Sequence, residues 1–381
     1  MTDATFSSLE SIQERDDELA GVEPELQDNS IVIDKPFDPD KIRVTTEKKN
    51  IDLLMRRIDH QEVDLAPEFQ RRARVWHPWR KSQLIESLLL RIPLPVFYVA
   101  ANQNDNWAVV DGLQRLTTIY DFVKDEFPLS GLEYLKALEN KTFSDLDRSL
   151  TRRIEETELV INVIQPGTPD EVMINIFKRI NTGGVPLTRQ EIRNALNKGP
   201  VREFLRRLAA SNAFNEATDH SVRDDRMDAQ EMVLRFLAFH MKPWTDYKSN
   251  DLDAFLNQTM RQINDSSEDA RKELESTFNK VNVAAMTLFG RFAFRKPKSD
   301  GEKRSPVSKP LFEAWTVNLA LLNEKEITML IAGRENVISA FRELIDSDPE
   351  FVLAISTSTG APQRVQMRFN RIKELIGSVI S

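Results

Sequence analysis

The residues best placed to do chemistry lie in one short stretch, residues 109–115, which reads Val-Val-Asp-Gly-Leu-Gln-Arg. Apolar residues typical of a strand lead into an Asp-Gly turn and then into residues typical of a helix. A helix that begins at such a turn directs its unpaired backbone N–H groups and the positive end of its dipole outward, where they favour an anion. The stretch therefore predicts a phosphate-binding turn.

The polar residues of this turn each suit a role at a phosphate. Gly112 lets a ligand approach the backbone closely, and Arg115 lies about one helical turn further on, where its guanidinium can grip a phosphate through two parallel hydrogen bonds. Asp111 can hold a metal-bound water, polarise a nucleophile or cap the helix. Without further context, a capping Asp111 and a surface Arg115 are the simpler interpretation.

A second polar cluster lies upstream of the turn. Gln70 and Arg71 stand between Phe69 and Trp76, two aromatic residues that we expect to face a core. Aromatic anchors of this kind could bring Arg71 near the first cluster. The alternative is that residues 71–74 form a solvated basic loop.

The hydrophobic pattern indicates which elements must position these residues. Between residues 36 and 198, the pattern predicts strands at residues 42–46, 63–65, 96–100, 107–110 and 159–164, and helices at residues 51–58, 81–90, 114–123, 169–180 and 188–197. The last of these helices opens with Thr188 and Glu191 in the spacing of a capping box. After Gly199-Pro200 the pattern is almost entirely helical, at residues 201–211, 228–240, 251–263, 268–289, 310–322, 326–344 and 364–379.

The composition is that of a globular protein with room for two domains. The chain has 381 residues, of which 40% are hydrophobic and 29% charged. It has no cysteine, which excludes disulfides, thiolate zinc sites and cysteine catalysis within these residues, and its four histidines argue against a histidine-rich metal site. Because there is no signal-peptide pattern and no apolar run of about 18 residues, we expect a soluble cytoplasmic protein without a membrane partner.

The negative charge is concentrated at the N-terminus. The whole chain carries −8, but residues 1–40 hold 12 acidic and two basic residues, and the rest holds 48 acidic and 50 basic residues. The low isoelectric point therefore does not argue against a nucleic-acid partner. We expect residues 1–35 to be a mobile acidic tail. It either keeps the chain soluble or covers a basic site as a mimic of nucleic acid.

Several blocks of sequence together resemble a known family. They are residues 69–71 with Trp76, residues 84–88, 92–95, 111–118, 177–184 and 186–195. In this order they are similar to the N-terminal domain of GmrSD-type restriction endonucleases, a family related to the ParB/sulfiredoxin fold. The resemblance spans residues 36–198. Leu113 departs from the family pattern, in which many members carry Gln, but this does not affect the charged positions.

The resemblance implies a fold and a ligand. Residues 36–198 would form a ParB/sulfiredoxin-like α+β domain with a small mixed sheet, followed by an all-α domain at residues 199–381. Relatives bind and hydrolyse nucleoside triphosphates and cooperate with a nuclease domain. Carried over by position, the catalytic residues would be Asp111, Gln114 and Arg115. The nucleotide- or phosphate-binding residues would be Gln70, Arg71, Gly112, Arg115, Thr117, Arg179, Asn181 and Gly184.

Other catalytic patterns fit the sequence less well. The four histidines do not form the HNH cluster of the longer relatives, so we expect a stand-alone member without a nuclease half. No Walker-type loop is present, which excludes conventional P-loop hydrolysis. Asp40, Glu47 and Lys49 match a metal-nuclease spacing, as do Asp125, Glu139 and Lys141, but short charged patterns of this kind recur by chance.

Three functions remain open from the sequence. The first is a nucleotide-binding, NTP-hydrolysing module of a microbial DNA-restriction or phage-defence system, with Mg²⁺ as a candidate cofactor and DNA, a separate nuclease or a second copy as candidate partners. The second is a non-enzymatic DNA-binding protein, in which Arg364, Arg368 and Arg371, at helical spacing, follow a nucleic-acid backbone; the alternative for these residues is a solvated face. The third is a protein-interaction scaffold. The sequence identifies no metal ligands.

Overall fold

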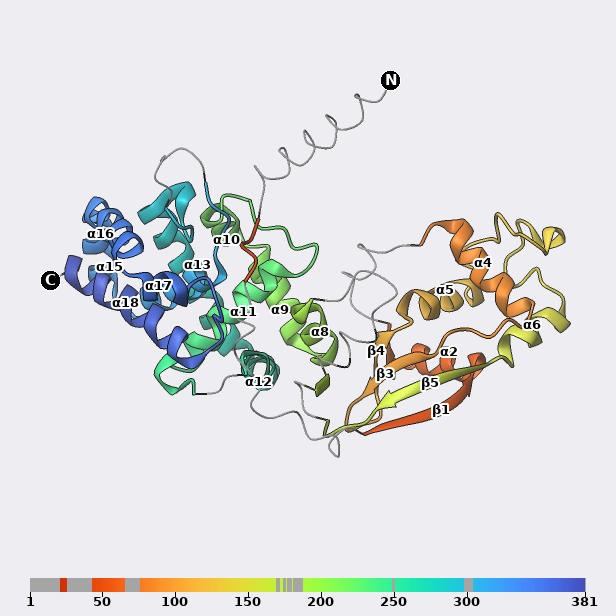
Figure 1. Cartoon of the computed structure of the whole chain (residues 1–381). Helices are drawn as coiled ribbons and strands as arrows, with labels where there is room; N and C mark the ends of the chain where they lie inside the picture. Colours follow the sequence, from red (N-terminus) through yellow and green to blue (C-terminus); the bar gives the residue numbers. More distant parts are fainter. Residues whose placement is uncertain are drawn as a thin grey trace, which may run out of the picture. The chain divides into compact units, whose positions relative to one another are not determined.

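The computed structural model describes residues 21–25, 43–65, 76–168, 172–173, 176, 180, 188–248, 251–297 and 304–380. The chain divides into two compact units, each described here by itself (Figure 1). The sheet unit comprises residues 35–196. The helical unit comprises residues 197–381 together with residues 1–34. No helix in the described ranges has the length and hydrophobicity needed to cross a membrane.

The sheet unit is built on five strands in the order β1-β5-β3-β4-β2 (Figure 1). The strands are β1 (Val44–Asn50), β2 (Val63–Asp64), β3 (Phe97–Ala101), β4 (Trp107–Asp111) and β5 (Glu158–Ile164). The pairs β1–β5 and β3–β4 are antiparallel, whereas β3–β5 and β2–β4 are parallel. The predicted α+β class with a small mixed sheet is therefore confirmed. Its relation to the ParB fold stays a prediction.

Alternation along the strands gives the sheet two buried faces. On β4, Trp107 and Val109 belong to the larger core, which is covered by α2 (Ile51–Asp59), α4 (Pro78–Leu89), α5 (Leu113–Val123) and α6 (Arg148–Glu155). Val110 points to the opposite face, where it joins a smaller cluster with Ile192 of α8 (Arg189–Leu196). The strand that ends at the Asp-Gly turn is thus fixed from both sides.

Helix α8 begins as its sequence predicts. The Glu191 backbone N–H donates to the Thr188 hydroxyl oxygen at 3.1 Å, and the Thr188 N–H donates to the Glu191 carboxylate at 2.6 Å. These reciprocal bonds satisfy two donors that the first turn of a helix leaves unpaired. The capping box is confirmed.

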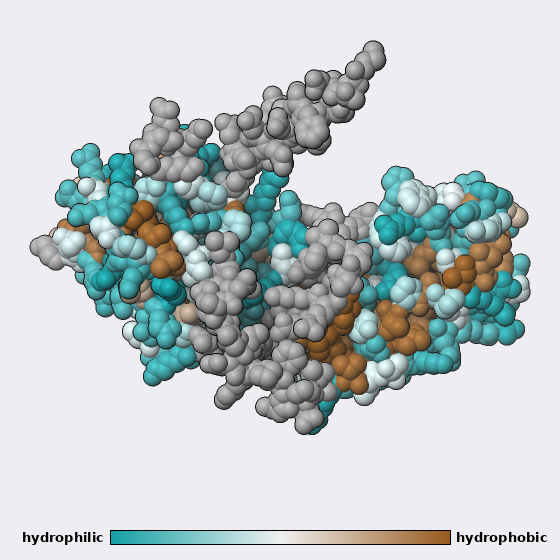
Figure 2. Space-filling view, in the orientation of Figure 1, coloured by the Kyte–Doolittle hydropathy of each residue, from teal (hydrophilic) through white to brown (hydrophobic). Residues whose placement is uncertain are grey.

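Apolar side chains also reach the surface of the sheet unit. Figure 2 shows brown apolar patches among its hydrophilic side chains. The large apolar residues that are exposed in this unit include Trp79, Ile92 and Tyr134. Near them, the buried Glu86 carboxylate accepts hydrogen bonds from three successive backbone N–H groups, at residues 133–135, which fixes the loop that carries Tyr134.

The helical unit packs around helix α11, which is buried on all sides. Its helices are α9 (Pro200–Ala209), α10 (Asn212–Ala217), α11 (Asp228–Met241), α12 (Leu252–Asp265), α13 (Glu268–Phe289), α14 (Lys309–Ala320), α15 (Glu324–Ala332), α16 (Arg334–Ser347), α17 (Pro349–Ala354) and α18 (Pro362–Ile380). Phe236 of α11 lies 5.3 Å from Phe278 of α13, measured between ring centroids, and both rings are fully buried. The predicted helical C-terminal part with an aromatic core is confirmed.

Two features of this unit differ from the sequence-based expectation. The single helix expected at residues 326–344 is two helices, α15 and α16, which meet at Gly333. A Cβ at Gly333 would lie 2.9 Å from the Val379 side chain, so glycine permits the close approach of α18. The short helices α10 and α17 were not expected, because six residues hold too few periodic positions to reveal a pattern.

The N-terminal residues 21–25, called the strap below, pack on the helical unit. Val22 forms a parallel β-bridge with Val307, and the Lys296 ammonium binds the Glu23 carboxylate at 2.6 Å. The expected mobile tail over residues 1–35 is therefore wrong for these five residues, because ion pairs and backbone hydrogen bonds hold them. The other residues of that tail lie outside the described part of the chain.

Candidate functional site

The turn at residues 111–115 has the predicted strand–turn–helix form. Strand β4 ends at Asp111, Gly112 is the N-cap, and α5 begins at Leu113. Gly112 has φ 91° and ψ 8°, the left-handed conformation in which a side chain is strained. A Cβ at this position would also overlap the Phe97 ring. The glycine is needed here for its conformation and for close packing against Phe97.

The N-terminus of α5 presents unpaired donors. Within the described residues, the backbone N–H groups of Leu113, Gln114 and Arg115 make no hydrogen bond, whereas the Gly112 carbonyl accepts from the Leu116 N–H at 2.8 Å. No side chain caps the helix. The alternative in which Asp111 is the cap is therefore wrong, because its carboxylate is bound to Arg115 instead.

Arg115 is held by the protein itself. Its Nη2 donates to Asp111 Oδ2 at 3.0 Å and to the Val96 carbonyl at 3.2 Å, and its Nη1 donates to the Pro95 carbonyl. The guanidinium lies over the Phe97 ring, 4.4 Å from the centroid, and its side chain is only 12% exposed. Burial lowers the pKa of Arg115, and the charge of Asp111 opposes that shift. Arg115 therefore joins the start of α5 to the segment before β3.

The remaining polar groups of the turn are accessible. The Asp111 side chain is 34% exposed, and the half-buried Gln114 amide makes no hydrogen bond to any described residue. Thr117, also half-buried, lies in the next turn of α5, further from the donors. The groups available to a ligand are thus the first-turn N–H groups, Gln114 and one side of Asp111.

Five of the predicted phosphate-binding residues cannot be placed at this turn. They fall outside the described part of the chain and are Gln70, Arg71, Arg179, Asn181 and Gly184. Their membership of the site stays a prediction. Among the described residues, His, Asp and Glu nowhere gather in a group of three or more that could hold a metal ion.

Arg368 cannot belong to the expected basic face on the last helix, whereas the part of Arg364 and Arg371 in that face stays a prediction. Arg368 is fully buried, and its Nε donates to Glu313 at 2.8 Å while Nη1 donates to the Thr359 carbonyl at 2.7 Å. Arg371 is partly exposed but forms an ion pair with Asp348 at 2.8 Å. A signal was present in the sequence, because position 368 lies on the apolar side of the helix, next to Phe369.

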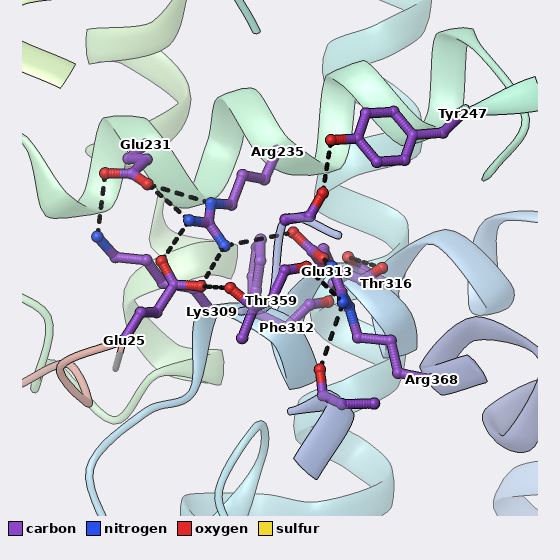
Figure 3. A network of polar contacts seen from close by, with 12 residues as sticks. Glu25, Glu231, Arg235, Tyr247, Lys309, Phe312, Glu313, Thr316, Thr359 and Arg368 are labelled. Carbon is purple, nitrogen blue, oxygen red and sulfur yellow. Dashed lines mark hydrogen bonds and ion pairs between the residues drawn. The ribbon is translucent and has the colours of Figure 1, made fainter. Parts of the chain in front are cut away.

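Charge-bearing residues that the sequence pattern did not single out gather in the core of the helical unit (Figure 3). Glu231 and Arg235 are four residues apart on α11 and pair at 2.9 Å, with Arg235 only 3% exposed. The network extends to Glu313 and to Glu25 of the strap. The signal was the presence of two opposite charges four residues apart in an otherwise apolar helix.

The comparison with protein families identifies the sheet unit. Residues 51–198 match the family described as GmrSD restriction endonuclease, N-terminal domain. The match contains the turn at residues 111–115 and helix α8. No curated protein matches the chain. The match covers less than half of the chain, and over residues 51–198 it confirms the resemblance seen in the sequence.

Proposed function

We propose that this chain is a nucleotide-binding module of a microbial DNA-restriction or phage-defence system, and that the N-terminus of α5 binds the phosphates of a nucleoside triphosphate. The family match supports the restriction or defence role. The observation that supports a bound phosphate is the set of three unpaired backbone N–H groups that follow Gly112. Such groups, with the dipole of an 11-residue helix behind them, favour a bound anion.

The accessible residues of the turn suit a nucleoside triphosphate with Mg²⁺. Backbone N–H groups bind phosphate oxygens, and the Gln114 amide can orient a phosphate oxygen or a water. Mg²⁺ is commonly bound through one or two carboxylates plus substrate phosphates, so the exposed side of Asp111 fits it as a single protein ligand. Hydrolysis at such a site needs positioning and charge stabilisation rather than covalent chemistry.

Arg115 has a different role from the one expected. With three acceptors and an aromatic ring already around its guanidinium, it positions the turn and adds positive charge close to the first-turn N–H groups. A phosphate bound at this turn would therefore meet a guanidinium that already pairs with Asp111. Gln114 is therefore the better residue to substitute as a test of binding.

The test is thermal unfolding with each of the four ribonucleoside triphosphates and Mg²⁺. A ligand at about 100 times its Kd stabilises the folded state by about 2.7 kcal/mol, so one nucleotide should raise the midpoint of the sheet unit clearly. Gln114→Ala should reduce the shift. The matched control is Gln103→Ala, an exposed residue at the opposite end of the β3–β4 hairpin. If no nucleotide shifts the unsubstituted protein, the nucleotide proposal is wrong.

The two other functions have less support. The DNA-binding hypothesis used Arg364, Arg368 and Arg371 as a second contact surface, and burial of Arg368 removes the centre of that surface. The scaffold hypothesis predicts that no nucleotide changes the unfolding temperature. The thermal experiment therefore separates it from nucleotide binding.

A further inference from the structure

The strap binds the helical unit as an extended peptide binds a strand. The Glu23 N–H donates to the Val307 carbonyl at 2.8 Å, and the Val307 N–H donates to the Gly21 carbonyl at 3.1 Å. This parallel pairing uses only backbone groups. Peptide recognition by strand addition works in the same way, with affinity from the backbone and specificity from alternate side chains.

Glu25, one of the two alternate side chains of the strap, binds in a carboxylate site of the helical unit (Figure 3). Arg235 Nη1 donates to Glu25 Oε1 at 2.9 Å, Arg235 Nη2 donates to the other oxygen, and the Thr359 hydroxyl donates to Oε1. Burial opposes ionisation, but the Arg235 guanidinium holds the pKa of Glu25 below its ordinary value. The two parallel bonds match the planar fork of arginine to a carboxylate.

The second alternate side chain, Glu23, meets a different cation. Lys296 Nζ donates to Glu23 at 2.6 Å and to the Ser356 hydroxyl at 2.8 Å. Residues two apart in an extended chain point to the same side. The helical unit therefore reads a Glu-x-Glu pattern with one cation for each carboxylate.

The strap pairs with Lys296 and Arg235 but does not fill the groove. Among the described residues, Glu23 is the only carboxylate that pairs with Lys296, and Arg295 donates to the Ser305 and Thr218 carbonyls and to a hydroxyl rather than to any carboxylate. An open cavity of about 470 Å³ lies beside the strap, with Arg223, Asp228 and Lys309 completing its lining. There is room for a larger peptide than the strap itself.

We propose that this groove is a binding site for an extended acidic segment of a partner protein, and that the strap is an intramolecular occupant that competes with it. The two backbone hydrogen bonds require a polypeptide, which disfavours a nucleic acid in the same place. The strap buries little apolar surface, because its one aliphatic side chain, Val22, is only partly buried and Pro24 is exposed. This inference concerns the helical unit and does not depend on nucleotide binding.

The test uses the full chain and a fluorescent peptide with the sequence of residues 18–28. The Glu23→Gln/Glu25→Gln chain has a weakened strap, so the peptide should bind it at least about tenfold more tightly than it binds the unsubstituted chain. Glu335→Gln/Glu350→Gln removes two exposed carboxylates of the same unit and is the matched control. The same peptide with the glutamates that correspond to Glu23 and Glu25 changed to glutamine should bind neither chain.

Three results would overturn the proposal. They are no peptide binding to a folded strap variant, binding that survives loss of the peptide glutamates, and displacement of the peptide by an oligonucleotide of equal charge at equal concentration. If the variant does not fold, native-state hydrogen exchange of the unsubstituted chain decides. The Glu23 and Val307 amides should open at lower free energy than the Arg235 amide in α11. Equal protection of these amides would make the strap a permanent part of the core and refute its displacement by a partner.

Discussion

At the scale of single residues, the geometry of the candidate site depends on Arg115 and Gly112, which both make close contacts within the protein. Arg115 makes hydrogen bonds to the Pro95 and Val96 carbonyls and to Asp111. Arg115→Ala should therefore lower the free energy of unfolding of the sheet unit by about 1–3 kcal/mol, because the Pro95 and Val96 carbonyls and the Asp111 carboxylate lose a charged donor. Urea unfolding measures the loss, and Arg148→Ala, at a side chain 72% exposed, is the control. An equally small effect of both substitutions would contradict the positioning role of Arg115.

Gly112 offers a sharper test, because the chain contains a matched glycine. Gly112 and Gly167 have nearly the same φ, 91° and 93°, but a Cβ at Gly167 would meet no atom within 4 Å. Both alanine variants bear the strain of a left-handed residue, about 1–2 kcal/mol. Gly112→Ala should cost about 1–3 kcal/mol more, since it must also displace the Phe97 ring. Equal losses in chemical unfolding would show that the Phe97 contact relaxes without cost.

At the scale of elements, the local sequence pattern was sufficient to predict those strands and helices in which burial follows a regular spacing. Strands β3 and β4 and helix α5 were predicted within one or two residues, because their apolar spacing and the Asp-Gly turn are local signals. The break at Gly333 and the burial of Arg368 were not predicted. Both depend on α18 lying against distant elements, namely the α15–α16 junction and Glu313 of α14. The roles of Arg115 and Glu25 also depend on residues far away in the sequence.

The ion pair between α14 and α18 gives a prediction at this scale. Arg368 and Glu313 are both fully buried, so Arg368→Met leaves a carboxylate without its closest partner and should destabilise the helical unit by about 3–5 kcal/mol. The double variant Arg368→Met/Glu313→Leu should recover most of that loss, because no buried charge of the pair remains unpaired. Thermal unfolding of the single and double variants forms the cycle. If the double variant is as unstable as the single one, the desolvation argument is wrong.

At the scale of the whole molecule, the two units have separate chemistry. The sheet unit carries the family match and the turn proposed to bind phosphate, and the helical unit carries a buried ionic network that includes the N-terminal strap. Along the sequence, residues 1–34 belong to the helical unit, residues 35–196 form the sheet unit, and residues 197–381 complete the helical unit. Native-state hydrogen exchange reports on the amides of each unit separately, so the effects of pH and of a ligand can be assigned to one unit.

The pH dependence of the helical unit follows from His240. Its ring stacks on Phe236 at 5.3 Å in the last turn of α11, and burial lowers its pKa below the ordinary 6.5. Around and just below pH 6.5 the unfolded chain therefore binds more protons at this position than the folded chain, so stability rises with pH there and is lost as pH falls through 6.5. Unfolding of the helical unit, followed at pH 8 and pH 5.5, should show a smaller decrease in His240→Gln than in the unsubstituted chain. His60→Gln, at an exposed position in the sheet unit, controls for loss of a histidine. Identical pH profiles for all three chains would mean that the His240 ring is hydrated enough to protonate without penalty in the folded state.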